Sequence, residues 1–169
     1  MRARDLLEPT PVVRRDSDAL EAAALLAAGD LKGLVVLDEA DRPVAVIPGS
    51  QVLRCVIPGY VLEDPHLARV FTEDDADHLT QELSKRSVGD VLESMPDGYA
   101  ARIGSAVVDP DATALEVLAV MARARVPLAA VADEGHFLGV VRMTRVLQQV
   151  LPDASVSQAE GTIEQTHDR

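Results

Sequence analysis

An internal repeat constrains the fold of this chain more than any other feature of its sequence. Four segments of the first half match four segments of the second half with nearly constant spacing. The matched pairs, with a one-residue adjustment after the second, are Thr10–Glu21 and Ser105–Glu116, Val36–Glu39 and Val131–Glu134, Val44–Ile47 and Leu138–Val141, and Val52–Leu53 and Val146–Leu147. Each copy ends at a proline, Pro58 or Pro152. Because self-similarity over such a span is typical of repeated structural units, the sequence predicts two copies of one unit.

Each copy has the pattern strand, helix, strand, strand, helix. The pairs Asp18-x-x-Glu21 and Thr113-x-x-Glu116 are capping-box patterns that predict helix starts, and Gly29 is a plausible stop for the first of these helices. Short β-branched runs around a polar turn predict a hairpin in each copy. The expected strands are Val12–Val13, Leu34–Leu37 and Val44–Ile47 in the first copy and Ala129–Ala132 and Leu138–Val141 in the second; the closing helices run from Gly49 or Ser50 to before Pro58 and from Thr144 to Leu151.

Composition excludes several classes of protein. The chain has 169 residues, 2% aromatic side chains, no Trp and a net charge of -12, so it lacks both the stacking rings and the basic groove of nucleic-acid binders. Its single cysteine, Cys55, permits no intrachain disulfide. Charged residues interrupt the most apolar stretch, 33–49, and the N-terminus is too short in apolar residues for a signal peptide. We therefore expect a cytoplasmic protein without membrane insertion or a nucleic-acid partner.

The βαββα unit repeated in tandem resembles a pair of cystathionine-β-synthase (CBS) domains, also called a Bateman module. The lead-ins Ala3-Arg-Asp-Leu-Leu7 and Val88-Gly-Asp-Val-Leu92 resemble the element that precedes such domains. The resemblance covers residues 1–58 and 87–152. It implies an α/β (α+β) fold in which two units pack through their sheets with pseudo-two-fold symmetry. It also implies a stand-alone regulatory protein that forms a homodimer and acts on a partner enzyme or transporter.

The predicted organisation has four parts: a first CBS unit with its lead-in (1–58), a helical insertion (59–86), a second CBS unit with its lead-in (87–152) and a disordered tail (153–169). In the insertion, residues 63–71 and 72–86 have helical patterns. Thr72 is the expected N-cap of the second helix, whose modest apolar stripe is Ala76, Leu79 and Leu83. A packed linker helix is the favoured interpretation, and an edge cover, a dimer contact or a docking site are the alternatives.

For a CBS pair, the resemblance implies a ligand cleft between the units that takes adenine nucleotides (AMP, ADP or ATP) or S-adenosylmethionine. In the family, a Gly-hydrophobic-x-Thr/Ser-x-x-Asp/Asn sequence supplies a hydroxyl to phosphate and a carboxylate to ribose. Here Pro48 and Gln51 stand at those two positions in the first copy, and Arg142 and Arg145 in the second. Neither copy can bind ribose in the usual way, but the two arginines can hold a phosphate or another anion.

The sequence does not decide between anion binding by these arginines and the alternative, in which they are surface charges or form a salt bridge across a dimer. A purely structural role is favoured for Pro48 and Gln51. The candidate ligand-binding residues are Val12, Gly33, Pro48, Ser50, Gln51, Val107, Val108, Pro127, Arg142, Met143, Thr144 and Arg145.

No catalytic constellation is recognisable, so we expect no enzyme and no required cofactor. The side chains of Asp74, His78 and Glu82 share a helix face, but a solvated face is favoured over a metal site there. The leading hypothesis is a regulatory CBS pair that senses a small ligand. The alternative is a constitutive dimeric interaction protein whose clefts have lost nucleotide binding.

Overall fold

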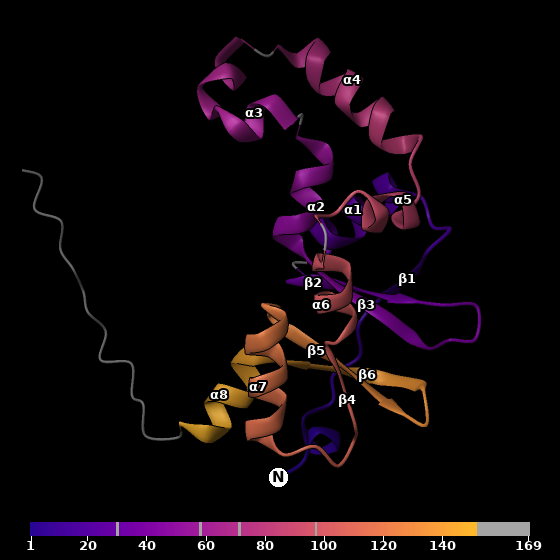
Figure 1. The fold of residues 1–169 in the computed structure, drawn as a ribbon, viewed down its shortest axis with the longest axis vertical. Coiled ribbons are helices and arrows are strands. Elements are labelled where there is room, and N and C mark those ends of the chain that lie inside the picture. The colour runs from indigo at the N-terminus through magenta and orange to yellow at the C-terminus, as the bar shows by residue number, and fades with distance from the viewer. Residues whose placement is uncertain (30, 58, 71, 97, 152–169) are drawn as a thin grey trace, which may run out of the picture.

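The computed structural model describes residues 1–151 apart from 30, 58, 71 and 97, and it contains the two predicted units (Figure 1). The first unit consists of β1 (Val12–Arg14), α1 (Ala19–Ala28), β2 (Gly33–Leu37), β3 (Pro43–Pro48) and α2 (Gly49–Val56). The second consists of β4 (Val107–Val108), α7 (Ala114–Ala124), β5 (Leu128–Asp133), β6 (His136–Arg142) and α8 (Met143–Val150). The predicted order of elements is confirmed in both copies. Pro58, Pro152 and the tail at 153–169 lie outside the described residues.

Each unit contains a three-stranded sheet with the same topology. The first and second strands of a unit are parallel, and the second and third are antiparallel. A parallel pair needs a crossover connection, which α1 and α7 provide. The hairpin register also shifts at equivalent residues, after Val36 in β2 and after Val131 in β5. The repeat therefore extends to the irregularities of the sheets.

The helices that follow the first strands start at side-chain caps. The Asp18 Oδ1 atom accepts hydrogen bonds from the amides of Leu20 (2.7 Å) and Glu21 (3.1 Å). In the second unit, Thr113 Oγ1 accepts a hydrogen bond from the Glu116 amide (3.2 Å). These bonds satisfy amides that have no partner within the first turn of a helix. The predicted N-cap residues are confirmed in both copies.

One hydrophobic core joins the two units. Strand β2 is buried along its whole length, and the core around it includes Leu128 and Ala130 of β5 and Val140 of β6. Strand β3 also contacts β5, so the two sheets pack against each other as expected. The buried side chains are mainly Val, Ala, Leu and Ile. A core built from small aliphatic side chains on closely packed strands needs few aromatic rings, which accounts for their scarcity.

Each lead-in packs against the unit to which it is not adjacent in sequence. The short 3-10 helix η1 (Ala3–Leu6) comes before β1, yet its first amide donates to the carbonyl of Ala112 in the second unit (2.9 Å). Helix α5 (Val88–Glu93) comes before the second unit, and its first amide donates to the carbonyl of Ser17 in the first (2.9 Å). The predicted boundaries group each lead-in with the unit that follows it, whereas its contacts tie it to the other unit.

The insertion projects from the end of the first unit (Figure 1). It contains α3 (Gly59–Glu63), the 3-10 helix η2 (Pro65–Val70) and α4 (Glu73–Ser84). Thr72 precedes α4 as predicted, and its amide and hydroxyl donate to the carboxylate of Asp75 (2.8 and 2.9 Å). Among the described residues, no helix has the length and apolar character needed to cross a membrane.

The end of α4 anchors the insertion to the first unit. Leu83 of the predicted apolar stripe is buried against Ala19 of α1 and Val91 of α5. Leu79 is half-buried, and the side chain of Ala76 lies outside the described structure. This end of the insertion therefore has the form of the packed linker helix that the sequence favours.

Candidate ligand site between the two units

A small cavity of about 110 Å³ lies where the two units meet at the end of β6. One wall comes from the second unit, with Val140 and Arg142. The opposite wall comes from the segment that leads into β2, with Lys32 and Gly33. The other lining residues are Glu8, Pro9, Thr10, Gly29, Leu31 and Leu128. The cavity thus combines residues of both units with the lead-in that connects them.

Arg142 ends β6 and forms an ion pair with the carboxylate of Glu8. The side chain of Arg142 is 54% exposed, while that of Glu8 is only 21% exposed. The sequence left open whether this arginine binds an anion or takes part in a salt bridge across a dimer. The structure shows a salt bridge within the chain, formed at the wall of the cavity.

Main-chain hydrogen bonds hold Glu8 beside Arg142. The Glu8 amide donates to the carbonyl of Val140 (2.9 Å), and the Val140 amide donates to the carbonyl of Glu8 (3.0 Å). Gly139 adopts a φ of 155°, and a Cβ atom there would lie 2.9 Å from the carbonyl oxygen of Glu8. The glycine of the second copy therefore leaves room for the lead-in to cross β6.

A wider groove adjoins this cavity and shares Leu31 and Lys32 with it. Its volume is about 780 Å³, and apolar side chains of α7 and α8 form much of its lining, with Arg125 at one side. Four of the candidate residues line it: Pro48, Ser50, Pro127 and Met143. Pockets of this volume are large enough for a nucleotide-sized molecule.

The counterpart of the lead-in segment at Glu8 is α6 (Tyr99–Gly104), which the sequence did not predict as a helix. This helix comes directly before Ser105, the counterpart of Thr10, and it contacts β3. Ile103 is completely buried in the shared core, and a Cβ atom on Gly104 would lie 3.1 Å from the carbonyl oxygen of Val44. The two units therefore differ in the segment that precedes the first strand: Glu8 bridges to β6, whereas the buried Ile103 belongs to a helix that contacts β3.

The remaining candidate residues are dispersed. Gln51 lines a separate cavity of about 180 Å³, together with Arg54 and Ser94, so Gln51 and Arg142 are not brought together. Thr144 and Arg145 are exposed on α8. The three valines lie on the first strands of the units: Val12 is exposed, Val107 half-buried and Val108 buried. These last five residues line neither the small cavity beside Arg142, nor the groove, nor the cavity beside Gln51.

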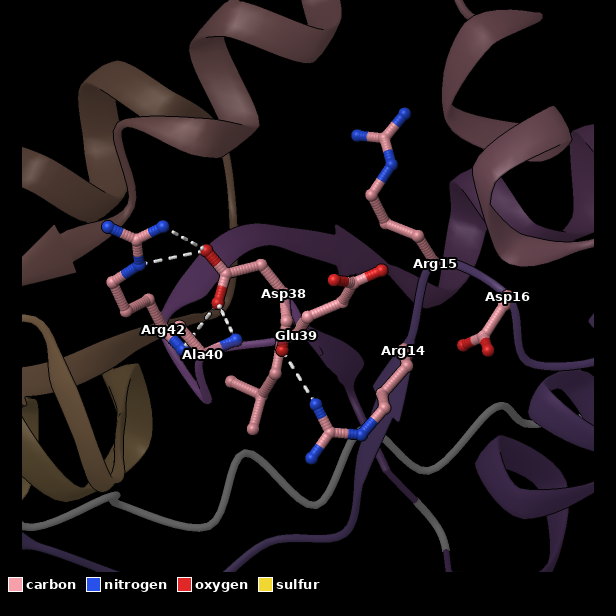
Figure 2. A pocket seen from close by; sticks show the side chains of 8 residues that line it. Arg14, Arg15, Asp16, Asp38, Glu39, Ala40 and Arg42 are labelled. Carbon is pink, nitrogen blue, oxygen red and sulfur yellow. Dashed lines mark hydrogen bonds and ion pairs between the residues drawn. The ribbon is translucent and has the colours of Figure 1, made fainter.

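Sequence reasoning missed a charged depression of about 680 Å³ at the hairpin end of the first unit (Figure 2). Its charged lining residues are Arg14, Arg15, Asp16, Asp38, Glu39 and Arg42. The sequence signal was the pair of charged runs, 14–16 and 38–42, at the ends of two paired strands. Taken alone, the second run indicates only a polar turn.

Asp38 organises this depression by closing the turn between β2 and β3. Its Oδ1 atom accepts hydrogen bonds from the amides of Ala40 and Arg42 (both 2.9 Å), and its Oδ2 atom pairs with the Arg42 guanidinium (Nε, 2.9 Å; Nη2, 2.8 Å). The pKa of Asp38 is lowered mainly by the hydrogen bond from the Arg42 amide. The Arg42 side chain and the Ala40 amide lower it further, against the opposing effect of desolvation. Figure 2 shows Arg14 and Arg42 both turned toward this turn, so their charges are engaged in hairpin structure.

The structure offers no metal centre in the part of the chain that it describes, because no group of three or more His, Cys, Asp or Glu side chains is placed to hold an ion. Glu82 pairs with Lys85 instead, and this hydrogen bond lowers the pKa of Glu82. The side chain of Asp74 is outside the described structure.

Comparison with known proteins identifies the family. The family model of the CBS domain matches residues 103–152, which is the second unit. A CBS domain-containing protein of unknown function from Kribbella flavida is 42% identical in sequence, with a TM-score of 0.73 over 89% of this chain and 99% of the other. This chain is a CBS-domain protein. Its two repeated units are a CBS pair.

More distant relatives share the fold of the CBS pair. The CBS domain of a CBS domain-containing membrane protein from Sphaerobacter thermophilus is 22% identical, with a TM-score of 0.63 over 88% of this chain and 86% of the other. The CBS-pair protein CBSX2 from Arabidopsis thaliana is 19% identical, with a TM-score of 0.59 over 89% of this chain and 94% of the other. CBSX2 has also been solved in complex with AMP. No curated protein is similar enough to count as a relative. CBS pairs are commonly regulatory, ligand-binding modules rather than enzymes.

Proposed function

We propose that this CBS pair is a regulatory module that binds a small anionic ligand in the cleft beside Arg142. The observation that carries the proposal is the position of Arg142: the second unit supplies this guanidinium to a cavity whose opposite wall belongs to the first unit. A ligand held there contacts both units, so its binding energy depends on how the units are arranged. This dependence is the physical basis for passing a signal to a partner enzyme or transporter.

An adenine nucleotide is the ligand class that these surroundings favour. The guanidinium of Arg142 suits a phosphate, and the adjoining apolar groove of about 780 Å³ suits a purine ring. The small cavity of about 110 Å³ accommodates only the anionic group. With Arg145 at the position where the family has a ribose-binding carboxylate, the phosphate contributes more to recognition than the sugar. S-adenosylmethionine is the second candidate, because its carboxylate can take the place of the phosphate.

The protein acts, in this proposal, as a homodimer. Leu118 of α7 lines the groove together with Met143 and Leu147 of α8, and Leu115 lies about one helical turn before Leu118. Leu115 is 77% exposed, and a second copy would cover it. Light scattering during gel filtration is expected to give the mass of a dimer, and Leu115→Asp is expected to lower it. Val70→Asp, on the exposed part of the insertion, serves as the control.

Calorimetry and thermal unfolding with AMP, ADP, ATP, S-adenosylmethionine, adenosine and inorganic phosphate test the ligand proposal. At least one phosphate-bearing nucleotide is expected to raise the melting temperature, since a ligand that binds only the folded state stabilises it. Arg142→Ala is expected to weaken that binding by about 10- to 100-fold, the range for a lost charge-assisted hydrogen bond. Arg123→Ala, an exposed arginine of α7 that lines none of these cavities, is the matched control.

Two results separate the alternatives. If no compound shifts the melting temperature at millimolar concentration, the sensor function is wrong and the constitutive interaction protein is favoured. If a nucleotide binds and Arg142→Ala leaves its affinity unchanged, the ligand site is elsewhere.

A further inference from the structure

The anion position on Arg142 already has an occupant from the same chain, the carboxylate of Glu8. We propose that Glu8 is a built-in competitor: a ligand phosphate or carboxylate must displace the Glu8 carboxylate from Arg142 in order to bind. This inference rests on the proposed function and names the regulation of the same site. It makes the resting state of the cleft a closed one, held by an ion pair between the lead-in and β6.

The main chain, rather than the choice of a surface rotamer, places Glu8 at this position. Two hydrogen bonds join its backbone to Val140 in both directions, and Gly139 allows the two segments to approach closely. Pro9 follows directly, which restricts Glu8 to extended backbone conformations. The carboxylate is therefore delivered to Arg142 by a fixed stretch of backbone, while its side chain keeps the freedom to move away.

Burial distinguishes this ion pair from most others on the surface. The Glu8 side chain is 21% exposed, whereas the acidic partners of Arg4, Arg14 and Arg15 are 68%, 65% and 74% exposed. Asp38 is similarly shielded at 23%, but its ion pair lies within a single hairpin turn. Solvent and salt screen a shielded pair less than an exposed one. An entering anion consequently meets competition from Glu8 that a freely solvated glutamate would not offer.

Because of the position of Glu8 in the chain, its displacement from Arg142 changes a contact between the two units. Residues before Glu8 pack on the second unit through η1, and the residues after it line the cavity and lead into β1 of the first unit. The pair between Glu8 and Arg142 therefore lies at the point where the chain passes between units. When a ligand displaces Glu8 from Arg142, a contact between the units that the lead-in provides is replaced by a contact that the ligand provides.

The test compares Glu8→Gln with Glu93→Gln. Glu93 ends the second lead-in as Glu8 follows the first, and it faces Arg15 at 3.5 Å, away from the cavity. Binding of AMP and of inorganic pyrophosphate is measured by calorimetry at one fixed salt concentration. Glu8→Gln is expected to bind about two- to fivefold more tightly than the unaltered protein, the range for removal of one partly exposed ion pair. Glu93→Gln is expected to leave the affinity unchanged.

The outcomes distinguish failure of the Glu8 competitor from failure of the proposed ligand-binding function. Tighter binding to Glu8→Gln that disappears in Glu8→Gln combined with Arg142→Ala supports the competitor. Unchanged or weaker binding to Glu8→Gln, with the unaltered protein still binding, overturns the competitor and leaves the ligand site standing. Absence of binding in all variants overturns both. Melting temperatures of the variants are measured in parallel, and a lower melting temperature without tighter binding assigns Glu8 a structural role only.

Discussion

Gly139 and Glu8 meet backbone to backbone, although 130 residues separate them: a Cβ atom at position 139 would lie 2.9 Å from the Glu8 carbonyl oxygen. The contact fixes where the lead-in crosses β6 and hence where the Glu8 carboxylate reaches Arg142. The geometry of the candidate site thus depends on a residue that has no side chain.

Gly139→Ala is expected to destabilise the protein by about 1–3 kcal/mol, because alanine tolerates the backbone conformation poorly and its Cβ collides with the lead-in. Gly98→Ala separates these two causes, since Gly98 has a φ of 75° and a Cβ atom there would have no neighbour within 4 Å. Its expected cost is about 1 kcal/mol, from conformation alone. Urea unfolding measures both values, and equal losses for the two variants would remove the contact with Glu8 from the explanation.

Asp38→Asn is expected to make stability less sensitive to acid. The folded-state pKa of Asp38 is lowered from 3.8, mainly by the Arg42 amide. The unfolded chain therefore binds more protons near that pH, so the stabilisation is present above pH 3.8 and is lost as pH falls through the folded-state pKa. Unfolding midpoints between about pH 3 and 7 should show a shallower acid decline for Asp38→Asn. Asp16→Asn, in the same depression, is the control, and parallel pH curves for Asp38→Asn and the unaltered protein would refute the prediction.

Ile103→Ala is expected to lower stability by about 2–5 kcal/mol, the usual cost of truncating a fully buried aliphatic side chain. Ile103 belongs to α6, the element by which the second copy departs from the first, and it is buried in the core shared by both units. Val70→Ala, at a residue that is 79% exposed, is expected to change stability by less than about 0.5 kcal/mol. A loss as small as that of Val70→Ala would show that Ile103 contributes little to the shared core.

The stoichiometry of ligand binding is expected to be one molecule per chain. The second unit places Arg142 at the cavity, whereas its counterpart in the first unit is Pro48, which offers no charge to an anion. Calorimetry with AMP gives the number directly. Gln51→Ala, in the separate small cavity, is expected to leave both stoichiometry and affinity unchanged. Two molecules bound per chain would mean that an anion also binds at the counterpart position, where Pro48 replaces the arginine.

Much of the fold could be predicted because its signals are local. The capping residues Asp18 and Thr113 lie within one turn of the amides that they bind, and the strands are short apolar runs that both copies share. The candidate site was predicted in part. Arg142 and Gly33 line the small cavity, and four further candidates line the groove, whereas Gln51 lines another cavity.

The sequence by itself determined the repeat and the order of the elements, since both can be detected by comparing residues at fixed spacing. The departure of both copies from the ligand motif rests in addition on the resemblance to the CBS family. Only the tertiary structure decided that each lead-in packs on the other unit, that α6 packs against β3 and that Glu8 pairs with Arg142. These are contacts between residues far apart in the chain. No spacing in a single sequence encodes them, because they depend on how two packed sheets bring distant segments together.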